Sequence, residues 1–232
     1  LFVWARDEYS HDIINRKFTS FNTINLCADL AHLLPDTFSL SEMMNSNQTR
    51  LLDWLRCSYK PVLVVNLHTD FGENNQIVQS QFEELISIYS HKFRFLFLPH
   101  DSRGARGEIQ INEVFFEYNN ANAFLSDVLE PEFEIFVLRH CYAVLTCRMH
   151  LGILALRSGI PALIVGYNGV KARGLLSHWD LEELLYVDPS DFKQLSSKLA
   201  DVCNSYAQIR AKISLKYAEI AQLSFNPIRD LL

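Results

Sequence analysis

The sequence lacks several features that would assign it to a functional class at once. It has no basic surplus, because 21 Lys and Arg stand against 27 Asp and Glu, for a net charge of -6. A nucleic-acid-binding domain usually carries a basic surplus or a clustered basic stripe, so we expect no nucleic-acid partner. No apolar run reaches the roughly 18–20 residues that span a bilayer. Residues 1–10 become charged too early to resemble a secretory signal.

The cysteines and histidines form none of the common metal-binding or catalytic patterns. The five cysteines include no Cys-x-x-Cys pair, and the eight histidines include no His-Glu-x-x-His pattern. We therefore expect reduced thiols in a cytoplasmic protein, and no bound metal. The sequence also has no Gly-x-Gly-x-x-Gly turn, no P-loop and no Gly-x-Ser-x-Gly elbow. Peripheral membrane association is compatible with these patterns.

What the sequence does contain is an alternation of apolar strands and amphipathic helices. Hydrophobic residues make up 49% of the chain and charged residues 21%, which is typical of a globular protein. Continuous apolar runs predict strands buried on both faces at residues 61–67, 93–98, 143–146 and 162–165. Shorter strands are predicted at 1–5, 24–27 and 184–187. Helices are predicted at 49–57, 78–89, 119–129, 131–138, 149–158 and 190–206, and a further helix follows to about residue 223. This order predicts a parallel sheet that binds ligands at the carboxyl ends of its strands.

The richest candidate site is the point where the strand at 143–146 turns into a helix. Arg148 and His150 lie at this turn. The backbone N–H groups and the dipole at a helix start favour an anion. Arginine adds a forked donor for phosphate or carboxylate, and histidine can donate to the anion or transfer a proton near neutral pH. From spacing alone, the alternative stays equally open: a surface charge at 148 and a helix-capping residue at 150.

Other polar residues also follow predicted strands and are weaker candidates on their own. Arg6, His100 and Lys171 each come after a strand, as do Asn66 and His68. Since the carboxyl ends of parallel strands share one edge of a sheet, Arg6 and Lys171 can bind an anion there, and His100 can act as acid, base or donor. The competing interpretations are a local ion pair for Arg6, a loop histidine at 100 and an exposed turn at 171.

Four segments of the sequence, taken in chain order, form a recognisable combination. The most specific one reads Arg-x-His-x-x-Ile-x-Ala at 148–155, then Gly-Ile-Pro at 159–161, then Tyr167 and Lys171. Three weaker segments precede it, at 5–10, 27–31 and 97–101. Together these segments resemble the polysaccharide pyruvyl transferase family, and the resemblance covers residues 5 to about 187.

The resemblance implies an α/β fold of the GT-B type, in which parallel Rossmann-like sheets with flanking helices face each other across a cleft. It implies that residues 1–58 are the C-terminal remnant of the first Rossmann-like domain, so that the N-terminal domain is incomplete in this chain. Residues 59–206 are then the second Rossmann-like domain, which carries the Arg-x-His motif, and residues 207–232 form a C-terminal helix.

The resemblance also implies transfer of a pyruvyl group from phosphoenolpyruvate to two hydroxyls of a sugar, forming a ketal, in cell-surface polysaccharide (exopolysaccharide) biosynthesis. The acceptor is a saccharide or a lipid-linked oligosaccharide precursor, and no cofactor is expected. For the proton transfers, His150 is the first candidate and His100 the second. The expected substrate-binding residues are Arg148, Arg6, Lys171 and Tyr167.

Two other functions stay open at this point. The first is a GT-B glycosyltransferase that uses a nucleotide sugar, with Arg148 on the diphosphate and Glu182 or Glu183 on the ribose. The second is a non-catalytic domain that binds sugars or protein partners. A comparison of phosphoenolpyruvate with UDP and GDP as ligands separates the two enzymes, and a lack of binding to all three favours the non-catalytic domain.

Overall fold

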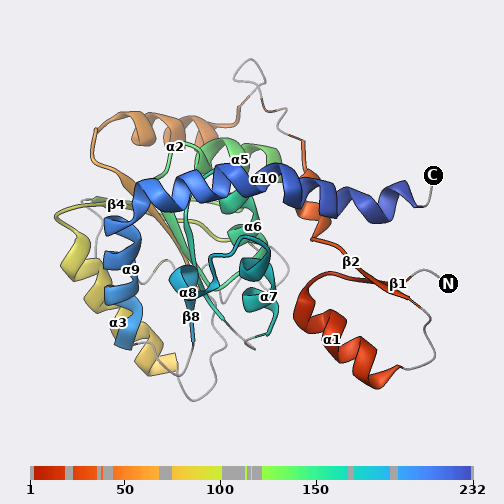
Figure 1. Ribbon diagram of the computed structural model, residues 1–232. Helices are drawn as coiled ribbons and strands as arrows, with labels where there is room; N and C mark the ends of the chain where they lie inside the picture. Colours follow the sequence, from red (N-terminus) through yellow and green to blue (C-terminus); the bar gives the residue numbers. More distant parts are fainter. Residues whose placement is uncertain are drawn as a thin grey trace.

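Two parallel sheets make up the framework of the protein. The computed structural model describes residues 3–18, 23–35, 38, 44–67, 75–100, 113, 116, 122–166, 170–188 and 193–230. Within these ranges, one sheet has two strands and the other has six. In Figure 1 the small sheet lies apart beside helix α1, and helices surround the large sheet. The prediction of an α/β fold with parallel sheets and flanking helices is therefore confirmed.

The large sheet has the strand order β5-β4-β3-β6-β7-β8, and all its neighbours run parallel. Its strands are β3 (Val62–Asn66), β4 (Arg94–Phe97), β5 (Ala123–Leu125), β6 (Ala143–Thr146), β7 (Ala162–Val165) and β8 (Tyr186–Val187). Strands β3, β4 and β5 follow one another toward one edge of the sheet, and β6, β7 and β8 follow one another toward the opposite edge. The order therefore reverses between β3 and β6, where Asn66 is in register with Thr146. Sheets of this type bind ligands outside the carboxyl ends of the strands at the reversal.

Helices cover both faces of the large sheet, as right-handed crossovers in opposite directions require. Helix α3 (Asn75–Tyr89) packs against α9 (Leu195–Asn204) on one face, and α5 (Pro131–Leu138) packs against α6 (Met149–Arg157) on the other (Figure 1). The strands between them are buried on both sides, which explains why they are continuous apolar runs. The remaining helices of this part are α2 (Ser46–Arg56), α7 (Val170–His178), α8 (Glu182–Leu185) and α10 (Tyr206–Arg229).

The N-terminal elements form a separate small unit that packs against α6, α7 and α10. They are β1 (Val3–Ala5), α1 (Glu8–Lys17), β2 (Ile24–Leu26) and the 3-10 helix η1 (Leu30–Leu33). Asp7 caps α1, because its carboxylate accepts a 2.7 Å hydrogen bond from the backbone N–H of Ser10. Helix α10 runs from the large sheet to this unit (Figure 1), where the Ser224 hydroxyl donates to the Asp29 carbonyl at 2.9 Å. The carboxyl ends of β1 and β2 are thereby held near the start of α6.

The domain boundaries after residues 58 and 206 stay predictions. None of the helices in the described ranges is both long and apolar enough to cross a membrane.

Four secondary-structure predictions were wrong or incomplete. The helix predicted at 119–129 is absent from its described part, residues 122–129, because Ala123–Leu125 pairs with β4 as an edge strand. The predicted strand at 184–187 begins as helix α8 and only Tyr186–Val187 joins the sheet. Helix α7 was not predicted, and α9 begins at Leu195 rather than at 190. In each case a short segment follows its tertiary packing rather than its own pattern, which carries too few residues to specify a period.

Candidate functional site

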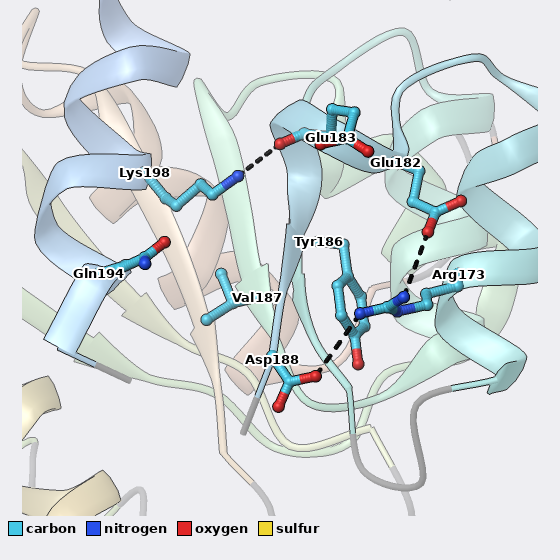
Figure 2. A pocket seen from close by; sticks show the side chains of 8 residues that line it. All are labelled: Arg173, Glu182, Glu183, Tyr186, Val187, Asp188, Gln194 and Lys198. Atoms are coloured by element: carbon cyan, nitrogen blue, oxygen red, sulfur yellow. Dashed lines mark hydrogen bonds and ion pairs between the residues drawn. The ribbon is translucent and has the colours of Figure 1, made fainter. Parts of the chain in front are cut away.

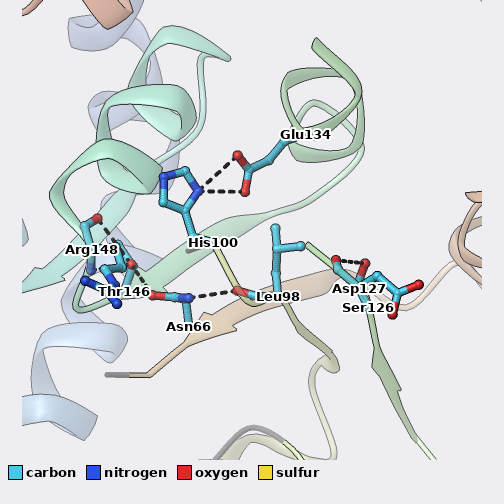
Figure 3. A network of polar contacts seen from close by, with 8 residues as sticks. All are labelled: Asn66, Leu98, His100, Ser126, Asp127, Glu134, Thr146 and Arg148. Atoms are coloured by element: carbon cyan, nitrogen blue, oxygen red, sulfur yellow. Dashed lines mark hydrogen bonds and ion pairs between the residues drawn. The ribbon is translucent and has the colours of Figure 1, made fainter. Parts of the chain in front are cut away.

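A buried hydrogen-bond network fixes the backbone at the reversal of the strand order. The amide of Asn66 donates to the carbonyl of Leu98 at 2.8 Å, and its Oδ1 accepts from the Thr146 hydroxyl at 3.0 Å. The same hydroxyl oxygen accepts from the backbone N–H of Arg148 at 2.8 Å. Figure 3 shows how these contacts join the ends of β3, β4 and β6. Since both Asn66 and Thr146 are fully buried, the network holds Arg148 in a defined position.

Arg148 is the residue that precedes the first turn of α6. Its backbone is extended, and its side chain makes no capping hydrogen bond to the helix. The N–H groups of the first turn and the positive end of the helix dipole therefore face the carboxyl edge of the sheet, next to a half-buried guanidinium. This is the arrangement that the sequence predicted for residues 143–150, and it is suited to a phosphate or a carboxylate.

The small sheet brings a second group of charges to the same place. Arg6, which follows β1, pairs with Asp29, which follows β2, at 2.9 Å. His150, in the first turn of α6, lies 3.9 Å from the same oxygen of Asp29, and its side chain is 57% exposed. Asp29 is mostly buried and also caps η1 by accepting from the backbone N–H of Ala31 at 3.0 Å. Two of the predicted residues, Arg6 and His150, thus meet around one fixed carboxylate.

A small hollow opens between these residues and α7. Arg6, Asp29 and Lys171 line it, together with Met149 of α6. Lys171 lies in the first turn of α7 and is exposed, as the alternative of an exposed Lys also expects. We name the group formed by Arg6, Asp29, Arg148, His150 and Lys171 the cationic cluster. Asp7 lines the hollow as well. With His neutral, the formal charge around the hollow is still positive, because three cations outnumber the two carboxylates of Asp7 and Asp29.

His100 occupies a different part of the edge, at the end of β4. Its Nδ1 lies 3.1 Å from both carboxylate oxygens of Glu134 (Figure 3). Glu134 projects from α5 and its side chain is only 2% exposed, whereas His100 is 19% exposed. A buried carboxylate that accepts from one ring nitrogen orients the imidazole and balances the charge of an imidazolium. The pair therefore has the geometry of an oriented acid or base.

A buried histidine lies close to the cationic cluster but has a different character. His32, in η1, is 1% exposed, and its ring lies 5.6 Å from the ring of Trp179. Neither ring nitrogen has a hydrogen-bond partner among the described residues. Burial lowers the pKa of His32 to about 4, and the nearby Asp29 carboxylate offsets only part of this effect. His32 is therefore neutral at physiological pH and has a structural role.

The structure brings together most of the residues that the sequence pointed to. Arg6, His150 and Lys171 gather around the start of α6, which Arg148 opens, and His100 lies further along the same edge. Tyr167 lies outside the described residues, as does His68.

Sequence reasoning missed the roles of Asp29 and Glu134. Asp29 follows a predicted strand just as Arg6 does, so its position gave a usable signal. Glu134 lies within an apolar helical segment, and its position there is the one signal the sequence offered.

No group of three or more potential metal-binding side chains gathers within the part of the chain that the structure describes. The site is therefore described by hydrogen bonds and charges alone.

Comparisons with known proteins identify the relatives of this chain. The sequence model of the polysaccharide pyruvyl transferase family matches residues 1–169. No curated protein matches the sequence.

Several solved structures share the fold. A glycosyltransferase from Rickettsia africae aligns with a TM-score of 0.64 and 10% identity, over 99% of this chain and 62% of its own. A UDP-GlcNAc 2-epimerase from Neisseria meningitidis aligns with a TM-score of 0.62 and 10% identity, over 99% and 60%. An α,α-trehalose 6-phosphate synthase from Burkholderia multivorans aligns with a TM-score of 0.61 and 10% identity, over 98% of this chain and 57% of its own. At such identities the similarity shows a GT-B-like fold alone, and this chain spans about three fifths of the length of these structures.

Proposed function

Because the chain belongs to the polysaccharide pyruvyl transferase family, we propose that it transfers a pyruvyl group from phosphoenolpyruvate to two hydroxyls of a sugar and forms a ketal. The acceptor is a cell-surface polysaccharide or its lipid-linked precursor. One observation carries the proposal: the cationic cluster forms where the ends of two parallel sheets meet the start of α6. Phosphoenolpyruvate carries a phosphate and a carboxylate, and several cations are needed to hold both.

In this proposal the cationic cluster binds the donor substrate. Arg148 and the N–H groups at the start of α6 bind one anionic group, as helix starts commonly do. Arg6 and Lys171 bind the other across the hollow that they line. Asp29 is a positioning residue, because its ion pair holds Arg6 beside His150. Tyr167 stays a proposed contact from the family motif alone.

The reaction needs one proton removed from each attacking hydroxyl and one proton delivered to carbon. A sugar hydroxyl attacks C2 of phosphoenolpyruvate while C3 gains a proton and becomes a methyl group. A second hydroxyl then attacks C2. Phosphate leaves with the electron pair of the broken C–O bond and takes up the proton that this hydroxyl loses. The products are a ketal and inorganic phosphate, and no oxidant or reductant is consumed.

We assign the two histidines to the two directions of proton transfer. His150, exposed and beside Asp29, accepts a proton from the attacking hydroxyl. His100, oriented by Glu134, donates a proton to C3. As negative charge shifts to the departing phosphate, the neighbouring arginines stabilise the transition state.

Ligand binding tests the donor assignment. In a thermal-shift titration at a concentration about 100 times Kd, phosphoenolpyruvate is expected to stabilise the chain by about 2.7 kcal/mol. That corresponds to a rise in Tm of roughly 5–10 °C for a chain of this size. Arg148→Ala should abolish the rise, whereas Arg56→Ala, at the exposed end of α2, should preserve it. A rise with UDP or GDP and none with phosphoenolpyruvate would instead support a glycosyltransferase, and no rise with any of the three would support a non-catalytic domain.

A further inference from the structure

A second pocket lies beside the edge strand β8. It encloses about 500 Å³ of empty space, its open mouth included, between α7, α8, β8 and the start of α9 (Figure 2). Its lining is dominated by charged and polar side chains, and Arg173 and Lys198 are its cations. The residues that bind phosphoenolpyruvate in the proposed function do not line this pocket. It is therefore a separate feature of the molecule.

The charges in this pocket do not favour an anion. Three carboxylates, of Glu182, Glu183 and Asp188, line it with two cations. The guanidinium of Arg173 lies 3.8 Å from Glu182 and 3.6 Å from Asp188, distances too long for direct hydrogen bonds. These groups are therefore close enough to face the same ligand without being locked to each other. Carboxylates accept hydrogen bonds, whereas guanidinium and ammonium groups donate them. A pocket that holds both kinds of group suits a ligand with hydroxyls, because a hydroxyl can donate and accept.

The inner wall of the pocket holds a buried hydroxyl that finds no hydrogen-bond partner in the described part of the chain. Tyr186 is 7% exposed, and its OH makes no hydrogen bond to any residue that the structure describes. The Arg173 guanidinium lies over the face of the ring, 4.6 Å from its centroid. Its proximity to the hydroxyl lowers the pKa of the phenol and so offsets part of the rise that burial causes, although the hydroxyl meets no donor or acceptor with full hydrogen-bond geometry among the described residues.

Tyr186 also reaches the carboxyl edge of the sheet. A Cβ added to Gly166, directly after β7, would lie 2.6 Å from the hydroxyl oxygen. The absence of a side chain at 166 therefore makes room for the Tyr186 hydroxyl. A buried polar group without a hydrogen-bond partner lowers the stability of the fold. A ligand that forms hydrogen bonds with the Tyr186 hydroxyl would explain why this position holds a tyrosine.

The pocket is linked to the cationic cluster through two elements. Lys171 of the cluster and Arg173 of the pocket are two residues apart on α7. The hydroxyl of Tyr9, on α1, lies 3.2 Å from both oxygens of Glu182. The two sites therefore lie in neighbouring parts of the molecule, on different sides of α7.

We propose that this pocket binds a saccharide unit of the acceptor, with hydrogen bonds from its hydroxyls to Tyr186, Glu182 and Asp188. The identification of the saccharide as an acceptor rests on the proposed function, whereas its binding does not. The site selects a neutral, hydroxyl-rich ligand over a phosphate, because the carboxylates outnumber the cations.

Calorimetry with methyl pyranosides of glucose, galactose, mannose and their N-acetylated forms tests the proposal. At least one is expected to bind the unaltered chain with a Kd in the range of about 1–10 mM. Tyr186→Phe should weaken that binding about tenfold while Tm stays equal or rises, because the lost hydroxyl has no partner among the residues that the structure describes. Asp188→Asn, which changes an exposed carboxylate, should weaken it as well and provides a second test if Tyr186→Phe does not fold.

Tyr89→Phe is the matched control, since the Tyr89 hydroxyl donates to the Ser196 carbonyl at 3.0 Å. It should lower Tm and leave saccharide binding unchanged. The proposal is overturned if no pyranoside binds, if Tyr186→Phe binds as tightly as the unaltered chain, or if it loses as much Tm as Tyr89→Phe. Failure of the proposed function would appear separately, as an absence of phosphoenolpyruvate binding to the unaltered chain.

Discussion

The burial of His32 predicts a measurable sensitivity of the fold to acid. Its pKa is about 4 in the folded protein and about 6.5 in an unfolded chain. The unfolded state therefore binds a proton first as the pH falls. Stability from this residue is complete above pH 6.5, declines as the pH falls, and is fully lost below pH 4. Between pH 7 and pH 5 the free energy of unfolding should fall by about 2 kcal/mol because of this residue. Over the whole range the fall is about 3 kcal/mol.

The substitution His32→Leu removes the titrating group and the two ring nitrogens that have no partner among the described residues. Urea denaturation at pH 7 and pH 5 should show that the variant loses about 2 kcal/mol less than the unaltered chain over this interval. All other titrating groups cancel in the comparison, since both chains contain them. His91→Leu, at an exposed position, is the matched control and should behave like the unaltered chain. Equal losses for His32→Leu and the unaltered chain would show that His32 is not buried as a neutral residue.

Two further perturbations test the packing and the site. Gly174→Ala should lower stability by about 1–3 kcal/mol in urea denaturation, because its Cβ would lie 2.6 Å from Cβ and Cγ of the α1 cap Asp7; an unchanged midpoint would contradict this close approach. Glu134→Gln should lower kcat for phosphate release from phosphoenolpyruvate at least about tenfold, with little change in KM, because it removes the charge that supports His100; an effect on KM alone would place His100 in binding rather than in proton transfer.

The large sheet could be predicted because its strands are buried on both faces. Residues 62–66 and 143–146 are fully buried in the structure. Burial on both faces favours apolar side chains at nearly every position, and the resulting continuous apolar run differs from the spaced apolar residues of an amphipathic helix. Polar residues directly after such strands could also be placed at one edge, which is why Arg148 and His100 were found. The regular alternation of elements made the parallel arrangement predictable.

The short elements could not be predicted, for a physical reason. Strand β5 has three residues and one strand neighbour, so its backbone hydrogen bonds depend on β4 rather than on its own side chains. The pairing of His100 with Glu134 links residues 34 positions apart, and that of His150 with Asp29 depends on how the small sheet packs against α6. Such contacts follow from tertiary packing, which local periodicity does not encode.

A crystal structure of the chain with bound phosphoenolpyruvate tests the central claim most directly. We expect one anionic group of the ligand within hydrogen-bond distance of Arg148 and the N–H groups at the start of α6, and the other facing Arg6 and Lys171, with His150 beside C2. A ligand bound elsewhere, or one held without any contact to Arg148 and Arg6, would contradict the account.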